Sequence, residues 1–242
     1  MILTLMTRPE PVSVSVPTGA GEMPAHLWRP ASGSGPGLLL LQEIFGVSGY
    51  IRRRAADLAE AGYVVLAPEL YWRLEAGPVD ESAPGAIEEA MGLAQRLDWA
   101  TTVTDAVAAL GALRARDDVD GGAGVIGFCF GGGLAFNVAA VDAPDVLVSY
   151  YGSALPQLLD LAPQVTAPSL HHFGTADDYI DGPTVERIRE AVTAGDATVE
   201  VQTYEGANHA FDNSDFVLHH PSASALAWER TLAFLARELP VS

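Results

Sequence analysis

The chain is organised around the segment Gly127-Phe128-Cys129-Phe130-Gly131-Gly132-Gly133. The apolar run Gly124-Val125-Ile126 before it predicts a strand, and the apolar run 134–140 after it predicts a buried helix. The backbone therefore turns sharply from strand to helix at Cys129, which has a glycine two residues before it and another two residues after it. A nucleophile elbow requires small residues at these places because larger side chains would clash in so tight a turn.

Cys129 has two interpretations at this stage. A lone free cysteine is most often a buried packing residue. The elbow favours a nucleophile instead, because it lifts the side chain clear of the sheet and sets it at a helix N-terminus, where free N–H groups favour a thiolate and a developing oxyanion. This assignment requires a base and an orienting acid further along the chain.

A second motif overlaps the first. The residues Gly122-Ala123-Gly124-Val125-Ile126-Gly127 match the dinucleotide fingerprint G-x-G-x-x-G. That fingerprint should follow a strand, whereas a helical run and the polar segment Asp117-Asp118-Val119-Asp120 precede it here. We therefore expect no nucleotide site.

Length and composition indicate one globular unit. The 242 residues are enough for a single α/β domain spanning 1–242. Hydrophobic residues make up 49%, but no apolar run approaches membrane-spanning length, and residues 1–8 lack the features of a signal peptide. We expect a cytoplasmic protein with no membrane partner that is a monomer or a weak homo-oligomer.

Charge and cysteine content exclude several classes of function. The formal net charge is −18, and all 13 basic residues are arginine, so the overall field repels a phosphate backbone and we expect no nucleic-acid partner. The single cysteine excludes an internal disulfide and a multi-cysteine metal site. A working free thiol belongs in a reducing compartment.

The apolar patterns predict an α/β fold with a mostly parallel sheet. The continuous run 37–41 is typical of a central strand covered on both faces, and alternation at 12–16 followed by a strand at 25–29 predicts an antiparallel edge pair. Arginines 52–54 are expected to form a solvated face of the first helix. Further strands are expected at 63–67, 146–151, 169–173 and 199–204, and helices from 48 or 49 to 61 and at 86–97, 101–116, 183–194 and 222–239.

Two charged residues follow buried strands. Glu43 comes after the run 37–41, and Arg73 comes after the strand at 63–67. Open α/β sheets place their ligand sites at the carboxyl ends of strands, so Glu43 is either a capping acid or part of a site. Arg73, among aromatic neighbours, is either a surface arginine or a group that holds an anion.

The acid and the base come from later loops. Asp177 follows the strand at 169–173, and His209 stands in the loop after the strand at 199–204. The order nucleophile, Asp, His is the one that α/β-hydrolases use. His171 and His172 point to opposite faces of one strand and are therefore expected to be structural.

These residues resemble the dienelactone hydrolase family, whose members are α/β-hydrolases with a cysteine nucleophile. The matching segments lie in order from the third expected strand to the last loop. They are Gln42-Glu43-Ile44-Phe45-Gly46, Pro68-Glu69-Leu70-Tyr71-Trp72-Arg73, Gly127-Phe128-Cys129-Phe130-Gly131-Gly132, Tyr150-Tyr151-Gly152, 174–177 and His209-Ala210-Phe211.

The resemblance implies a catalytic role for each matching residue. Cys129 would be the nucleophile, His209 the base and Asp177 its orienting acid, with Asp178 as the alternative acid. The carboxyl group of Glu43 would contact the resting thiol.

The resemblance also implies which groups bind the substrate. The backbone N–H groups of Ile44 and Phe130 would form the oxyanion hole. Arg73 would bind a substrate carboxylate, and Tyr151 and Asn213 would contact the substrate as well. Asn213 stands where the family has a second arginine, so an acidic substrate would meet one arginine rather than two, and neutral esters should be hydrolysed at least comparably.

The implied activity is hydrolysis of a small-molecule ester or lactone, such as a dienelactone, through a thioester acyl-enzyme, with no metal and no organic cofactor. A general carboxylesterase or thioesterase acting on neutral esters is the alternative among enzymes. A non-catalytic ligand-binding protein on the same scaffold is the alternative from another class.

Overall fold

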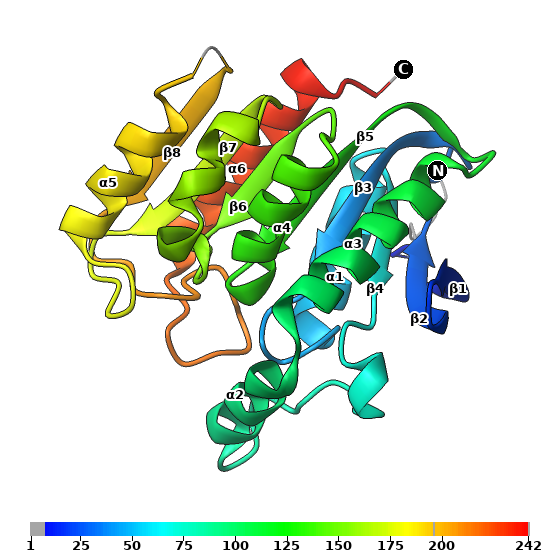
Figure 1. Cartoon of the computed structure of the whole chain (residues 1–242), viewed down its shortest axis with the longest axis horizontal. Coiled ribbons are helices and arrows are strands. Elements are labelled where there is room, and N and C mark those ends of the chain that lie inside the picture. The colour runs from blue at the N-terminus through cyan, green and yellow to red at the C-terminus, as the bar shows by residue number, and fades with distance from the viewer. Residues whose placement is uncertain (1–7, 196, 242) are drawn as a thin grey trace, which may run out of the picture.

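The computed structural model describes residues 8–195 and 197–241. Residues 1–7, where we expect no signal peptide, lie outside the described residues. Its centre is an eight-stranded sheet in the order β1-β2-β4-β3-β5-β6-β7-β8 (Figure 1). The pairs β1–β2 and β2–β4 are antiparallel and the other neighbours are parallel. The strands are β1 Val12–Thr18, β2 Gly21–Trp28, β3 Gly35–Leu41, β4 Val64–Pro68, β5 Val119–Phe128, β6 Leu147–Tyr150, β7 Ser169–Gly174 and β8 Val199–Tyr204.

Helices cover both faces of this sheet. Helices α3, α4 and α5 lie in front of it in Figure 1 and pack into one apolar cluster, while α1 and α6 lie behind it and pack into another. The helices are α1 Gly49–Glu60, α2 Ala86–Arg96, α3 Trp99–Arg114, α4 Phe130–Val141, α5 Gly182–Val192 and α6 Pro221–Glu238. The expected α/β-hydrolase architecture is therefore confirmed, with each expected helix and strand present and its ends shifted by a few residues.

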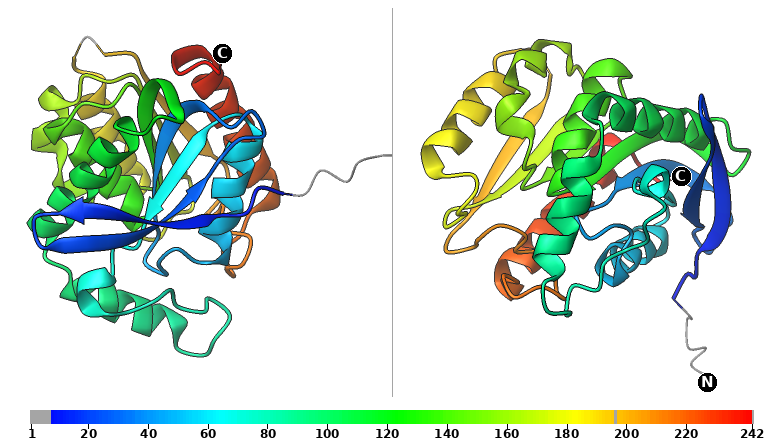
Figure 2. Two further views of the ribbon diagram at one scale, coloured as in Figure 1. Left: turned by 90° about the vertical axis from the view of Figure 1, so that its right-hand side faces the viewer. Right: turned by 60° about the horizontal axis from the view of Figure 1, so that its bottom comes forward.

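The strand patterns follow from position in the sheet. Every residue of β3 is buried, because its neighbours β4 and β5 flank it and helices cover both faces. The hairpin β1–β2 instead forms an edge, which Figure 2 shows as a long antiparallel ribbon, and β1 has only one buried residue, Val16. The alternating and continuous runs of the sequence reflect this difference in covering.

The dinucleotide-like glycines lie inside β5 rather than at a turn between strand and helix. A Cβ on Gly124 would lie 2.5 Å from a methyl group of Val146, and one on Gly127 would lie 2.0 Å from the carbonyl oxygen of Gly131. Both distances are shorter than any real Cβ contact, so these glycines permit close packing of β5 against its neighbours. This supports the expectation that the motif is not a phosphate-binding loop.

Helix α2 stands apart from the other five. It lies beyond the carboxyl ends of the strands, at the lower end of the view in Figure 1 and in front of the sheet in the right-hand view of Figure 2. Its residues Ala86 and Ala90 are buried in a small third cluster with Phe45 and Val79. This position makes α2 a wall over the edge where Glu43 and Cys129 lie.

The expectation that arginines 52–54 face solvent is wrong for Arg54. Its side chain is 13% exposed and donates to Asp212 through Nε (2.8 Å) and Nη2 (2.6 Å). Asp212 also accepts from Ser224 of α6 at 2.7 Å. The buried carboxylate of Asp212 needs a paired cation, and only the folded chain shows that Arg54 supplies it.

Within the described ranges, no helix is both long enough and apolar enough to cross a membrane.

Candidate active site

Cys129 occupies a strained turn between β5 and α4. Its backbone angles are φ 51° and ψ −113°, a left-handed region that side chains other than glycine rarely adopt. A Cβ on Gly131 would lie 2.2 Å from the carbonyl oxygen of Leu41, so the close approach of β3 requires glycine there. Strain of this kind costs ~1–3 kcal/mol and is typical of functional sites.

Strained backbone gathers around this cysteine. Among the described residues, four that are not glycine have positive φ: Glu75, Cys129, Tyr151 and Ala210. Cys129 and Ala210 line one cavity, and the Tyr151 ring packs on His209 with ring centroids 5.2 Å apart. Three of the four strained positions therefore converge on the same place, which marks it as the candidate functional site.

The structure brings Cys129, His209 and Asp177 into one line. Nε2 of His209 lies 3.2 Å from Sγ of Cys129, and Nδ1 lies 2.9 Å from Oδ2 of Asp177. All three side chains are buried. The imidazole therefore bridges a thiol and a carboxylate, as nucleophilic catalysis requires.

The loop after β7 separates the roles of its two aspartates. Oδ1 of Asp177 accepts from the backbone N–H groups of Tyr179 (2.8 Å) and Ile180 (2.9 Å), which holds the carboxylate toward His209. Asp178 is exposed and accepts from the side chain of Asn208 at 2.7 Å. The geometry therefore favours Asp177 over Asp178 as the partner of His209.

The charge state of His209 depends on its two neighbours. Burial lowers the pKa of His209, but the Cys129 thiolate and the hydrogen bonds to Asp177 and Cys129 outweigh burial and raise it to about 10. A protonated imidazole beside the sulfur stabilises a thiolate. His209 is therefore suited to carry the imidazolium form beside the sulfur at neutral pH.

Glu43 is buried beside this pair, in the short turn after β3. Its carboxyl group accepts from Tyr151 Oη at 3.1 Å and from Asn213 Nδ2 at 2.7 Å. Burial, reinforced by the charge of Glu81, raises the pKa of Glu43 to about 8. Tyr151 and Asn213, which were expected to contact substrate, thus hold Glu43, and Asn213 supplies no positive charge to it.

Arg73 has a different partner from the expected substrate carboxylate. Its guanidinium donates to both oxygens of Asp105 in α3, from Nε and Nη2 at 2.8 Å each, and stacks over the Trp72 ring at 4.5 Å. Trp72 donates to the same carboxylate at 2.9 Å. Arg73 does not line the cavity that contains Cys129, because this ion pair draws it toward α3.

The two expected oxyanion donors flank Cys129. Phe130 is the first residue of α4, and the first N–H groups of a helix have no acceptor within it. Ile44 lies in a turn closed by a hydrogen bond of 3.1 Å from the Gly46 N–H to the Glu43 carbonyl oxygen, and it lines the same cavity as Cys129.

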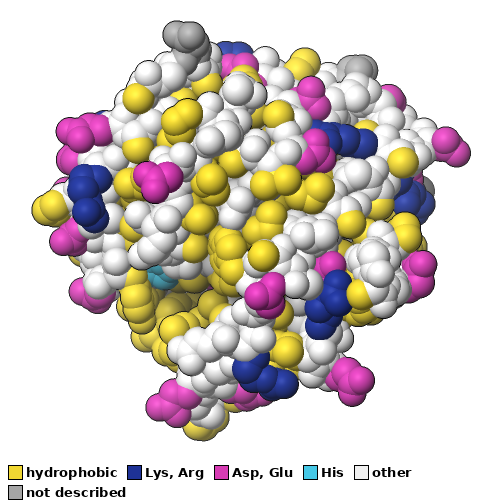
Figure 3. Space-filling view, viewed as in Figure 1, with side chains coloured by type: hydrophobic (Ala, Val, Ile, Leu, Met, Phe, Trp, Pro, Cys, Tyr) yellow, Lys and Arg dark blue, Asp and Glu magenta, His cyan; other side chains and the backbone are white. Residues whose placement is uncertain are grey.

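The cavity at Cys129 has a volume of about 290 Å³. Most of its wall is apolar. Figure 3 shows a hollow beside α2 that is surrounded by hydrophobic side chains and contains a histidine side chain. The lining residues are Glu43, Ile44, Phe45, Ile87, Met91, Cys129, Ser153, Tyr179, His209, Ala210, Phe216, Val217 and Leu218.

Sequence reasoning missed the part of this wall that comes from α2 and from residues 216–218. The signal was weak, since Phe216-Val217-Leu218 is an isolated apolar triplet between polar loop residues. Among the residues the structure describes, no group of three or more metal-ligating side chains could hold an ion.

Known proteins resemble this chain over nearly its whole length. Residues 23–239 match the model of the dienelactone hydrolase family. A carboxymethylenebutenolidase of Pseudomonas sp. (strain P51) is 35% identical over 227 residues, which are 92% of this chain and 93% of that protein. A carboxymethylenebutenolidase of Pseudomonas putida is 36% identical over 213 residues, which are 88% of this chain and 90% of that protein.

Solved structures agree with this result. A protein of Klebsiella pneumoniae subsp. pneumoniae, provisionally assigned as a dienelactone hydrolase, superposes with a TM-score of 0.82 at 30% identity, covering 96% of this chain and all of that one. An acylaminoacyl peptidase of Pyrococcus horikoshii shares the fold alone, with a TM-score of 0.75 at 14% identity over 98% of this chain and 43% of that one. The family match and the full-length relatives together place this chain in the dienelactone hydrolase family.

Proposed function

We propose that this protein hydrolyses an ester or lactone bond of a small molecule with Cys129 as nucleophile, His209 as acid and base, and Asp177 as the group that orients His209. The observation that carries the proposal is the line of contacts from Sγ to the imidazole (3.2 Å) and from the imidazole to the carboxylate (2.9 Å). The carboxymethylenebutenolidases that resemble it support the same class of reaction.

The acylation step begins from the thiolate and the imidazolium. The sulfur attacks the carbonyl carbon, an S–C bond forms, and the carbonyl electrons move to oxygen, where the N–H groups of Ile44 and Phe130 stabilise the oxyanion. When the tetrahedral species collapses, the C–O bond to the alcohol breaks. Nε2 of His209 gives its proton to the leaving oxygen, which leaves a thioester on Cys129.

The deacylation step reverses the proton transfer. Neutral His209 takes a proton from water, and the resulting hydroxide attacks the thioester carbonyl. The C–S bond then breaks, the acid leaves, and the thiolate is restored beside the imidazolium. Asp177 keeps Nδ1–H directed toward itself, so Nε2 always faces the sulfur.

A general carboxylesterase or thioesterase would use the same steps. A binding protein without turnover is the alternative outside enzymes, but it has no need for a strained cysteine with an oriented histidine. The comparison with relatives supports hydrolysis over binding alone.

A chromogenic ester tests the proposal. With 4-nitrophenyl acetate we expect a burst of nitrophenolate equal to the enzyme concentration if deacylation is the slower step, and acetylated enzyme in the mass spectrum of a quenched sample. Cys129→Ala should abolish both signals. Retention of more than a few per cent of the activity in Cys129→Ala would contradict the mechanism.

A further inference from the structure

The mouth of the Cys129 cavity is apolar although it faces solvent. Four of its lining residues are large hydrophobic side chains that are substantially exposed: Ile87 (45%), Met91 (41%), Tyr179 (70%) and Val217 (85%). Solvent-exposed apolar side chains that gather around a cavity mark a binding site, whereas single ones need no explanation. These exposed side chains line the same cavity as Cys129 and His209.

Helix α2 presents two of these side chains by its geometry. Ile87 and Met91 are four residues apart, so they lie on one face of the helix, one turn above the other. Ala86 and Ala90, each one position earlier, are buried against Phe45 and anchor the helix. Ala86 and Ala90 thus anchor α2, while Ile87 and Met91 line the cavity.

The cavity lining offers no guanidinium group to a substrate carboxylate. Glu43 is among the lining residues, and no arginine is among them. Arg73 is engaged by Asp105, and Arg53 pairs with Asp215. The cationic group in the lining, the His209 imidazolium, is already engaged by Cys129 and Asp177, so a substrate carboxylate would find no free cation among the described lining residues.

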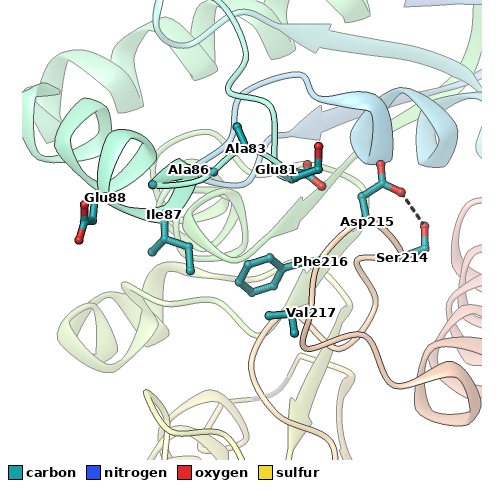
Figure 4. Close-up of a pocket in the computed structure, with 11 residues that line it drawn as sticks. Glu81, Ala83, Ala86, Ile87, Glu88, Ser214, Asp215, Phe216 and Val217 are labelled. Carbon is teal, nitrogen blue, oxygen red and sulfur yellow. Dashed lines mark hydrogen bonds between the residues drawn. The ribbon is translucent and has the colours of Figure 1, made fainter.

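A second cavity adjoins the first and is also acidic. It has a volume of about 750 Å³ and shares Ile87, Phe216 and Val217 with the first. Figure 4 shows these three side chains between the acidic residues, with Glu81 and Asp215 on one side and Glu88 on the other. Burial raises the pKa of Glu81, so its carboxyl group, like that of Glu43, offers an approaching anion no positive charge.

We propose that the substrate is an uncharged ester or lactone with a bulky apolar group that packs against Ile87, Met91 and Val217, and that these residues determine specificity. The inference rests on the proposed hydrolysis at Cys129 and names the class of substrate. The cavity of about 290 Å³ is roughly ten times the ~30 Å³ that one water occupies in the liquid, which gives room for an acyl or aryl group.

The charge preference is tested with one matched pair of substrates. Methyl 4-nitrophenyl adipate and 4-nitrophenyl hydrogen adipate differ only in one carboxylate that is remote from the scissile bond. We expect kcat/KM to be at least about tenfold higher for the methyl ester, because the acid must carry its charge into a mostly apolar cavity whose lining provides no free cation. Equal values, or a preference for the acid, would overturn the inference.

The apolar contacts are tested with chain length and rim variants. In Ile87→Ser with Val217→Ser, we expect kcat/KM for 4-nitrophenyl hexanoate to fall about tenfold and that for the acetate to change less than about twofold, because only the longer acyl chain buries these side chains. Val141→Ser is the matched control, since Val141 is an exposed valine (63%) at the end of α4 that does not line the cavity. Equal losses on both esters would contradict the assignment of specificity.

Binding separates this inference from the proposed function. Cys129→Ala protein cannot form the acyl-enzyme, so dissociation constants of the intact adipate esters can be measured by calorimetry. We expect the methyl ester to bind at least about tenfold more tightly than the acid. If the wild type hydrolysed none of these esters but bound the methyl ester more tightly than the acid, the proposed hydrolysis would be contradicted while the substrate class stood. If the wild type hydrolysed the esters but Cys129→Ala bound both equally, only the substrate class would be contradicted.

Discussion

At the scale of single residues, the site depends on which aspartate carboxylate reaches Nδ1 of His209. Asp177 and Asp178 are neighbours in sequence, but only Asp177 is buried and reaches His209, at 2.9 Å. The two backbone N–H groups that bind its other oxygen hold it there. Adjacent residues of the same type therefore have different partners because one loop conformation directs their side chains apart.

We expect Asp177→Asn to lower kcat by about a thousandfold or more, because an amide stabilises neither the correct tautomer of His209 nor its imidazolium. Asp178→Asn is the matched control and should leave kcat within about twofold. Steady-state kinetics on 4-nitrophenyl acetate measure both. A larger loss in Asp178→Asn than in Asp177→Asn would reassign the acid.

Glu43 should make stability depend on pH. Its pKa rises from an ordinary 4.5 to about 8 on folding, chiefly through burial, so between these values the unfolded chain releases a proton that the folded chain retains. Stability that is present below pH 4.5 is then lost as pH rises to about 8, by the order of a few kcal/mol. Glu43→Gln removes this loss.

Thermal unfolding of both proteins from pH 5 to pH 9 checks this prediction. The difference in melting temperature should shift in favour of Glu43→Gln as pH rises, while the two proteins stay close near pH 5. A constant difference across the range would show that Glu43 is ionised in the folded protein at every pH tested.

At the scale of elements, steric constraints determine the turn from β5 to α4. It needs glycine where the start of α4 passes the end of β3, and it leaves Cys129 with a strained backbone. The apolar residues of α4 then bury the helix on the sheet and stabilise the strained turn. The Cys129 side chain, the proposed nucleophile, is therefore positioned by packing at a distance from the sulfur itself.

We expect Gly131→Ala to destabilise the fold by about 3 kcal/mol, because its Cβ would lie 2.2 Å from the Leu41 carbonyl oxygen and neither backbone can move freely. Gly111→Ala in α3 is the matched control. No atom lies within 4 Å of the Cβ it would add, so alanine should stabilise that helix by ~0.5–1 kcal/mol. Urea unfolding measures both changes, and a stable Gly131→Ala would contradict the steric account.

At the scale of the whole molecule, one buried ion pair joins three distant segments. Arg54 comes from α1, Asp212 from the loop that carries His209, and Ser224 from α6, and all three meet at the Asp212 carboxylate. The loop that carries His209 is thus fixed to two helices on the same face of the sheet. This arrangement links the position of His209 to the packing of the molecule.

Arg54→Met should cost ~3–5 kcal/mol, because it leaves the Asp212 charge buried without a partner. Adding Asp212→Asn should recover part of the loss by removing that charge. Arg53→Met is the control, since Arg53 (39%) and its partner Asp215 (38%) are partly exposed and such pairs contribute ~0–1 kcal/mol. Denaturant titration of the four proteins checks this, and equal costs at the two arginines would show that burial does not govern the pair.

Local patterns in the sequence were sufficient for the fold and for the three central candidates. Continuous apolar runs predict strands covered on both faces, and the glycines around Cys129 predict a close approach of backbone segments. Both are short-range effects that any chain with these residues must obey. The order of Cys129, Asp177 and His209 along the strands then places them at one edge of the sheet.

Only the tertiary structure decided which charged and apolar side chains meet. Arg73 could have faced a substrate but pairs with Asp105, the Arg54 side chain is 13% exposed whereas that of Arg53 is 39% exposed, and Asn213 binds Glu43. The apolar wall from α2 and residues 216–218 was likewise invisible before folding. The reason is physical: backbone sterics and burial act between residues close in sequence, whereas the partner of a long side chain depends on which distant segments the fold brings within a few ångströms.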